Sequence, residues 1–127
     1  MMLTSINLPT HDARKLADFY HKVLSANIDD SHGGPNRIEI WFGDRDEKPV
    51  CIVANQDENY KRQETTTCQG FEFAVQDADS EYARIRDLGV EIKDPPQDLP
   101  WGYRYFHIKD PDGNGIDIVQ ELSATIK

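Results

Sequence analysis

Two stretches of the chain carry apolar residues at helical spacing. Between about Asp12 and Leu24 the apolar side chains recur every three or four positions, which predicts an amphipathic helix with Asp12 as its N-cap. A shorter stretch from about Ala78 to Leu88 shows the same pattern, with an aspartate before it and Gly89 placed to end it. The sequence therefore predicts two similarly built helices, far apart in the chain.

Runs with strand-like patterning surround each predicted helix. One run precedes each helix and others follow it, separated by turn residues, and corresponding runs lie 64 to 66 positions apart. The pattern indicates one unit, a strand, a helix and then strands, that occurs twice. The predicted strands are 5–9, 37–43, 50–54, 70–76, 103–109 and 115–120, with weakly marked strands at 28–32 and 90–93.

The length of the repeat sets the domain organisation. A copy of about 60 residues is too small to be stable alone, so the two copies should bury their apolar faces together. We therefore expect a single domain over residues 1–127. Its first module spans about 3–55, a polar connector spans about 56–69, and its second module spans about 70–122.

Alternation within the strands divides the side chains into two sets. One set is almost wholly apolar, and we expect it to lie beneath the helices. The other mixes acidic, aromatic and other polar residues, which suits neither a dry core nor a plain solvent face, and we interpret it as a binding surface. Its candidate ligand-binding members are Arg37, Glu39, Trp41, Cys51, Glu72, Tyr103, Tyr105, His107 and Asp117, together with Trp101, which either covers the surface as a lid or packs at the module junction.

Composition limits the classes of partner. The chain has 23 acidic against 14 basic residues and a formal net charge of -9, which makes nucleic acid a poor partner. No apolar run approaches the roughly 20 residues that span a bilayer, so no membrane partner is expected. The first residues lack the pattern of an export signal, and Cys51 and Cys68 lack paired spacing, so we expect a cytoplasmic protein with two reduced thiols.

Several motifs together resemble one superfamily. They are the tandem modules, Phe19-Tyr20 in the first helix, the Pro-Trp-Gly segment at 100–102, and DPDGN at 110–114 followed by IDIVQ. Over about residues 3–122 the chain resembles the vicinal oxygen chelate superfamily, also called the glyoxalase, bleomycin-resistance and dioxygenase superfamily. This resemblance implies an α+β fold in which tandem βαβββ modules form a shared, cup-shaped, mainly antiparallel sheet with the helices on its outer face. It also implies a homodimer.

The resemblance allows a test for the metal site of the superfamily's enzymes. Those enzymes place one ligand near the start of the first strand and one on the last strand of each module. Counting seven residues back from each helix cap and seven forward from each turn aspartate gives Ser5, Gly70, Cys51 and Asp117. Only Asp117 is a donor of the expected kind, so we predict no metal and no cofactor. A relocated site that joins His107 to Cys51 and Asp117 stays open.

The resemblance leaves the function open, because the superfamily includes lyases, isomerases, thiol transferases, ring-cleaving dioxygenases and metal-free drug-binding proteins. Carboxylates on the predicted surface must take up a proton, be neutralised by Arg37 or His107, or bind a cation. Our first hypothesis is a metal-independent protein that binds or sequesters a small cationic or aromatic molecule. The alternative is a lyase-type or isomerase-type enzyme that uses His107 and Asp117, with or without a relocated metal.

Overall fold

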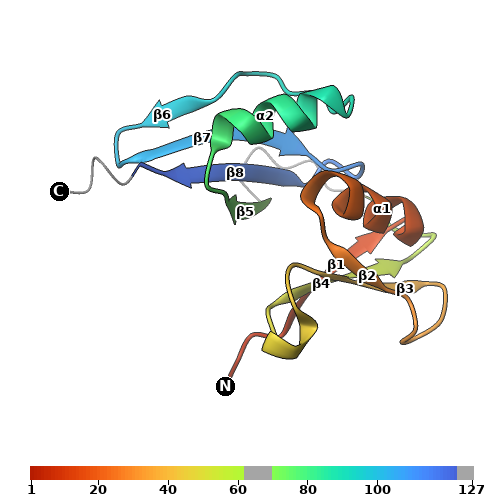
Figure 1. Cartoon of the computed structure of the whole chain (residues 1–127). Helices are drawn as coiled ribbons and strands as arrows, with labels where there is room; N and C mark the ends of the chain where they lie inside the picture. The colour runs from red at the N-terminus through yellow and green to blue at the C-terminus, as the bar shows by residue number, and fades with distance from the viewer. Residues whose placement is uncertain (62–69, 123–127) are drawn as a thin grey trace. The chain divides into compact units, whose positions relative to one another are not determined.

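Two helices and eight strands occur in the described part of the chain, residues 1–61 and 70–122 of a computed structural model (Figure 1). The chain forms two compact units, residues 1–64 and 65–127. The first unit contains β1 (Ser5–Thr10), α1 (Ala13–Leu24), β2 (Asn27–Asp29), β3 (Arg37–Trp41), the short 3-10 helix η1 (Arg45–Glu47) and β4 (Cys51–Gln56). The second contains β5 (Gly70–Ala74), α2 (Ala78–Asp87), β6 (Gln97–Leu99), β7 (Tyr103–Lys109) and β8 (Gly115–Glu121).

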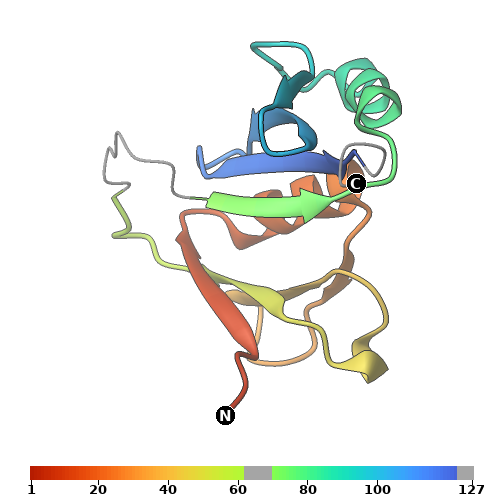
Figure 2. The ribbon, with the colours of Figure 1, turned by 90° about the vertical axis from the view of Figure 1, so that its left-hand side faces the viewer.

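Each unit has a four-stranded mixed sheet, and the two sheets have the same topology. The strand order is β1-β4-β3-β2 in the first unit and β5-β8-β7-β6 in the second. The first and last strands of each unit pair in parallel, β1 with β4 and β5 with β8, as Figure 2 shows, and the other pairs are antiparallel. The α+β class and the repeated strand-helix-strand unit are therefore confirmed.

One helix packs on each sheet, and both predicted caps are present. Asp12 accepts a hydrogen bond from the backbone nitrogen of Lys15, and Asp77 accepts from those of Asp79 and Ser80. Helix α1 contacts β3 and β4, while α2 contacts β7 and β8. Burial of apolar side chains beneath each helix stabilises the unit, and in α2 the buried residues are Ala78 and Ile85, whereas Leu88 directly after it is 50% exposed.

A glutamine tethers the start of each helix to the sheet. The backbone nitrogen of Ala13 donates to Oε1 of Gln56 at 3.0 Å, and that of Ala78 donates to Oε1 of Gln120 at 2.8 Å. The first amides of a helix have no partner within the helix, so each glutamine satisfies a group that would otherwise need water. This contact recurs at the corresponding place in the two units.

One predicted strand is wrong. The segment 90–93 is not a strand, and the edge strand of the second sheet is β6, which pairs with β7 through Gln97, Asp98 and Leu99. The backbone nitrogen of Gly102 donates to the carbonyl of Leu99 and closes a turn, so the strand that reaches β7 lies directly before that turn. The apolar residues in 90–93 are half-buried without strand pairing. In the first unit the weakly marked strand is β2, which is shorter than the predicted 28–32 and begins one residue earlier.

The spacing of the repeat also needs correction. His107 pairs with Asp117 as Glu39 pairs with Val53, so β3 and β7 correspond at a distance of 68 positions and β4 and β8 at 64. The loop 42–50 is longer than its counterpart 110–114, which produces the difference. The offset is therefore not 64 to 66 throughout. Within the predicted connector, residues 62–69, with Cys68, lie outside the described residues.

We predict that Gln120→Ala lowers the free energy of unfolding by about 1 kcal/mol, because the amide of Ala78 loses its acceptor. Urea unfolding followed by far-ultraviolet circular dichroism measures the change. Gln76→Ala is the matched control, because Gln76 is exposed and makes no hydrogen bond with the described residues. Equal stabilities for the two variants would contradict the tether.

Candidate functional site

The face of the second sheet that points away from α2 carries Glu72, Asp117 and His107 in one row. Asp117 on β8 is the cross-strand partner of Glu72 on β5 and of His107 on β7. Paired positions on neighbouring strands project to the same side of a sheet, so the three side chains are neighbours. The register thus places them on one face, as the alternation predicts, while their role in binding stays a prediction.

The next rows of the same face carry aromatic rings. Tyr105 is paired with Val119 on β8 and with Gln97 on β6, and Tyr103 is paired with Glu121. The face therefore presents two phenol rings beside the acidic row. The apolar side chains of the intervening positions on β7 and β8 lie on the helix side and are buried: Phe106, Ile108, Ile116 and Ile118.

His107 and Asp117 form a carboxylate–imidazole pair. Nδ1 of His107 lies 2.7 Å from Oδ1 of Asp117, and the side chains are 47% and 43% exposed. A carboxylate accepts hydrogen bonds, so Nδ1 of His107 is the donor in this contact, and in the tautomer that this requires of an uncharged ring Nε2 is an acceptor. The pair thus fixes one tautomer and keeps a basic nitrogen accessible.

Glu72 differs from the other two members of the row because it has no ion-pair partner among the described residues. It is exposed and makes no hydrogen bond or ion pair with the described residues. It lies directly beside Asp117, so the row holds two carboxylates and one imidazole. Two adjacent carboxylates attract a cation or an N–H donor to this part of the face.

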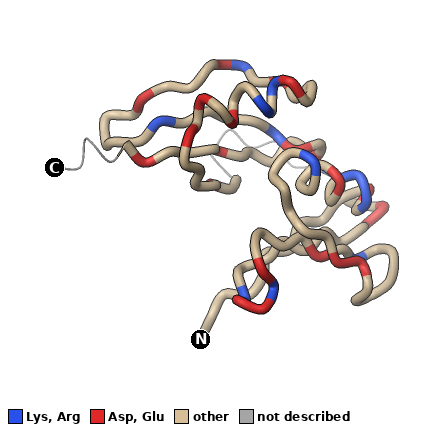
Figure 3. Tube along the Cα trace, viewed as in Figure 1, with Lys and Arg blue, Asp and Glu red and all other residues tan. Residues whose placement is uncertain are grey.

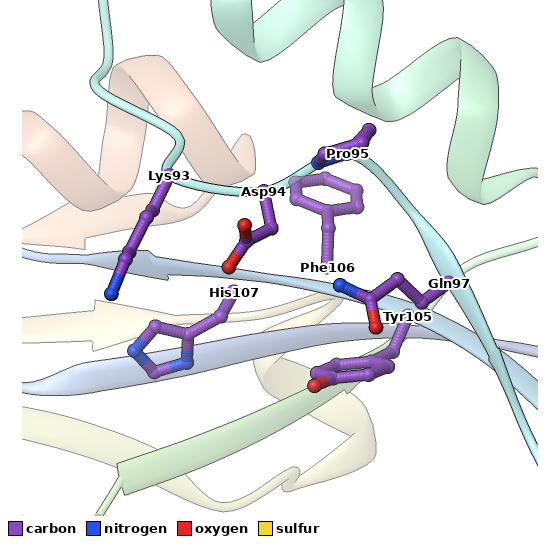
Figure 4. Close-up of a pocket in the computed structure, with 7 residues that line it drawn as sticks. All are labelled: Lys93, Asp94, Pro95, Gln97, Tyr105, Phe106 and His107. Carbon is purple, nitrogen blue, oxygen red and sulfur yellow. The ribbon is translucent and has the colours of Figure 1, made fainter.

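A small pocket adjoins the row where the segment before β6 passes β7, with a volume of about 80 Å³. In Figure 4 the side chains of Lys93 and Asp94 extend toward His107, which they approach from outside the sheet. Sequence reasoning missed both, because neither belongs to a periodic pattern. It missed Gln97 because β6 was placed too early. The pocket is lined by Lys93, Asp94, Pro95, Gln97, Tyr105, Phe106 and His107.

The corresponding face of the first sheet is centred on Glu39. This carboxylate is buried, and it accepts hydrogen bonds from Nη1 of Arg37 at 2.7 Å and from Nε1 of Trp41 at 3.0 Å. Burial opposes its ionisation, but the hydrogen bonds from Arg37 and Trp41 and the charge of Arg45 together lower the pKa of Glu39. Of the outcomes left open by the sequence, neutralisation by Arg37 is the one seen at Glu39.

Arg45 is a member of this face that sequence reasoning missed. Its guanidinium carbon lies 5.2 Å from the centroid of the Trp41 ring, and its nitrogens contact Glu39 and Asp29. Hydrogen bonds from Ser31 and the charge of Arg45 hold the pKa of Asp29 well below its usual range. Trp41 therefore already faces a cation from its own chain. No pattern in the sequence signals this contact, because Arg45 lies in a loop.

Two further predicted members have settings that limit their chemistry. Trp101 is exposed in the turn between β6 and β7 and does not line the pocket beside His107. Cys51 is a free, buried cysteine on the same face as Glu39. Burial, with the negative charge of Glu39, raises the pKa of the Cys51 thiol, so it stays protonated at neutral pH and is a weak nucleophile.

Comparison with known proteins identifies the family. The model of the Glyoxalase/Bleomycin resistance protein/Dioxygenase superfamily matches residues 3–118. The chain belongs to this superfamily. The predicted resemblance is therefore confirmed, whereas superfamily membership alone defines no ligand or reaction.

Three known proteins match over nearly the whole chain. The "Uncharacterized protein YraH" of Bacillus subtilis (strain 168) is 28% identical over 131 residues, which cover 96% of this chain and 100% of that protein. The crystal structure of TioX from Micromonospora sp. ML1 has a TM-score of 0.70 and 19% identity, with 96% and 100% coverage. A superfamily member from Sphaerobacter thermophilus DSM 20745 has a TM-score of 0.71 and 23% identity, with 95% and 98% coverage. The two structural matches show the fold.

The residues at the superfamily's metal-ligand positions do not fit a divalent ion. By register the first-unit counterpart of Asp117 is Val53 and not Cys51, which the count of residues from the turn predicts. Valine has no atom that coordinates a metal. Gly70 has no donor, and a Cβ there would lie 2.1 Å from the carbonyl oxygen of Gly115. Ser5 offers a neutral hydroxyl, which leaves Asp117 as the one anionic donor among these four positions. The residue types at these four positions still favour a site without a metal, and the absence of a metal stays a prediction.

Elsewhere, among the residues that the structure describes, three potential metal ligands approach one another at Asp29, His32 and Glu39. Both carboxylates are already in contact with guanidinium groups, Asp29 with Arg45 and Glu39 with Arg37 and Arg45. Positive charge so close to the donor atoms opposes the binding of a metal cation. This group therefore does not replace the superfamily's metal site.

The charge distribution agrees with an attraction for cations. Acidic positions lie along both units (Figure 3), in a chain with a formal net charge of -9. A negative protein concentrates small cations near its surface and speeds their association.

Within the described residues, neither helix is long and apolar enough to cross a bilayer.

We predict that Glu39→Gln lowers the free energy of unfolding at pH 7 by about 1–3 kcal/mol, because two guanidinium groups lose their carboxylate. The pKa of Glu39 is lowered by folding, so its contribution is complete above the unfolded pKa of about 4.3 and is lost as pH falls through the folded pKa. The variant should therefore lose less stability than the parent between about pH 5 and pH 3.

Urea unfolding at a series of pH values measures this difference. Glu91→Gln is the control, because Glu91 is exposed and has no ion pair among the described residues. A Glu39→Gln profile parallel to that of the parent would contradict the assigned role of the carboxylate.

Proposed function

We propose that the protein binds or sequesters a small organic cation on the polar face of the second sheet, without a metal ion. The observation that carries the proposal is the row of Glu72, Asp117 and His107, in which Glu72 has no partner among the described residues. A cationic group on the ligand would complete the charge balance of the row. The adjacent phenol rings would supply contact area and cation–π attraction to the rest of the molecule.

The ligand has two parts in this proposal. Its ammonium or amidinium group lies between Glu72 and Asp117, and its aromatic body lies over Tyr103 and Tyr105. The pocket beside His107 has room for a few heavy atoms, so it is too small for the aromatic body of the ligand. Trp101 in the adjoining turn is a candidate cover for the aromatic part.

Membership of the superfamily supports this proposal in general terms, because members often bind small molecules and form oligomers. The choice of a cation comes from this chain's own carboxylates and its net charge. A homodimer, which the resemblance to the superfamily implies, and a cytoplasmic location, which the sequence favours, remain part of the proposal.

We predict that Glu72→Gln weakens the binding of 2-phenylethylammonium about tenfold, because the cation loses its unpaired carboxylate. The neutral 2-phenylethanol should bind equally weakly to the parent and the variant. Ligand-observed NMR titration measures both affinities. Glu91→Gln is the charge-matched control, and equal weakening by the control, or none by Glu72→Gln, would remove the assignment.

A second function is favoured by the His107–Asp117 pair. An imidazole held by a carboxylate through Nδ1, with Nε2 accessible, is a suitable general base for removing a proton next to a carbonyl group. Lys93, which extends toward the same ring, could stabilise the negative charge that forms on the substrate oxygen. This reading makes the protein an isomerase-type or lyase-type enzyme that acts without a metal.

We predict for this alternative that the protein exchanges a carbon-bound proton of a small α-hydroxycarbonyl compound with deuterium from solvent in the presence of a chelator. His107→Gln should abolish the exchange, and Asp117→Asn should slow it by at least tenfold, because the wrong tautomer becomes accessible. Proton NMR in deuterium oxide follows the reaction. Absence of exchange across dihydroxyacetone, glyceraldehyde and lactaldehyde would favour the binding protein.

A further inference from the structure

We propose that Asp29, Glu39 and Trp41 form a second site, in the first unit, for a guanidinium or amidinium group, and that Arg45 of the chain itself occupies this site as a built-in competitor. The site would open to an external cation when Arg45 moves away. It is independent of the proposed function, because none of its residues belongs to the second unit.

The contacts of Arg45 are those expected of a bound organic cation. Its guanidinium lies over the Trp41 ring, with 5.2 Å between the guanidinium carbon and the ring centroid. One terminal nitrogen lies 3.5 Å from Oε1 of Glu39, and the other contacts Oδ2 of Asp29. An aromatic face and two carboxylates around one planar cation are the elements of a cation-binding cage.

The cage is held by the sheet, whereas the cation comes from a loop. Asp29 on β2 is the cross-strand partner of Glu39 on β3, and Trp41 is two positions further along β3. The side chains of Glu39 and Asp29 are 9% and 18% exposed, but that of Arg45 is 48% exposed. Arg45 lies in η1, within the long loop between β3 and β4. The groups that form the cage are therefore held on strands, whereas Arg45, which fills it, is more exposed than either carboxylate.

An open hollow leads to the cage. Its volume is about 460 Å³, and Asn27, Asp29, Trp41 and Arg45 are among its lining residues. This space would take the body of a ligand whose cationic end replaces the guanidinium of Arg45. The hollow belongs wholly to the first unit.

The charges that face the cage favour exchange of one cation for another. With Arg45 in place, two carboxylates contact two guanidinium groups, and Nδ1 of His32 lies 3.5 Å from Asp29. Without Arg45, Arg37 is the one arginine among the described residues that still contacts these carboxylates, through Glu39. Asp29 would then lack its guanidinium partner, and an external cation would restore the balance. A planar cation fits better than a metal ion because Trp41 supplies a ring face and no atom that coordinates a metal.

Competition by Arg45 lowers the apparent affinity of the site for any external cation by the fraction of molecules in which the cage is open. Replacing Arg45 with glutamine should therefore tighten binding of benzamidinium about tenfold. The experiment uses a Trp101→Phe background, in which Trp41 is the one tryptophan left and its fluorescence reports on the cage. Neutral benzamide has nearly the same shape, and its affinity should be the same with and without the Arg45→Gln substitution.

Controls separate the cage from a general change in charge. Arg14 is another exposed arginine, and it forms an ion pair with Asp30. Arg14→Gln should leave the affinity for benzamidinium at the parent level. Adding Glu39→Gln to Arg45→Gln should cancel the tenfold gain. Glu72→Gln should leave the gain unchanged, so failure of the proposed function and failure of this inference give different results.

The unaltered protein provides a test that does not depend on a substitution in the cage. Saturation with benzamidinium should shift the Nε–H resonance of Arg45 in a nitrogen-15 NMR spectrum, while that of Arg104, which contacts Asp79 and Asp98 in the second unit, stays in place. An unmoved Arg45 resonance at saturation would overturn the inference. So would an Arg45→Gln variant that binds benzamidinium no more tightly than its parent, or one that gains equally for benzamide.

Discussion

The register of each sheet is the constraint on which the candidate sites depend. Neighbouring strands place paired residues on the same side, so one pairing determines the face of every other residue in the sheet. The pair His107–Asp117 sets the polar face of the second sheet, and the pair Glu39–Val53 sets that of the first. A shift of one residue would move these polar side chains under the helices and bring apolar ones to the surface. Packing of α1 and α2 on the apolar faces prevents that shift.

Charge balance then gives the two faces different properties. On the first sheet, Glu39 is surrounded by donors from Arg37, Trp41 and Arg45, so its charge is met inside the chain. On the second, Asp117 has His107 as its partner and Glu72 has none among the described residues. The same topology therefore carries one face with an internal cation and one with an unpaired acid, which is why a ligand is assigned first to the second face.

The sequence predicts much of the fold and part of the site. Helical spacing with capping aspartates located α1 and α2, and alternation located β7 and the shared face of Tyr105, His107 and Asp117, because regular periods follow from backbone geometry. The strand expected at 90–93 failed because half-burial alone can produce alternation without pairing. The contacts of Arg45, Lys93 and Asp94 could not be predicted from the sequence, because these residues lie outside the strands and no periodic pattern determines where their side chains point.

The proposed function requires that a ligand binds on the polar face of the second sheet. Backbone amide NMR of the nitrogen-15-labelled protein, titrated with 2-phenylethylammonium, locates the bound cation. The largest shift changes should occur at Glu72, Tyr105, His107 and Asp117. Changes confined to α2, or spread evenly over the exposed acidic residues, would rule out binding at this face.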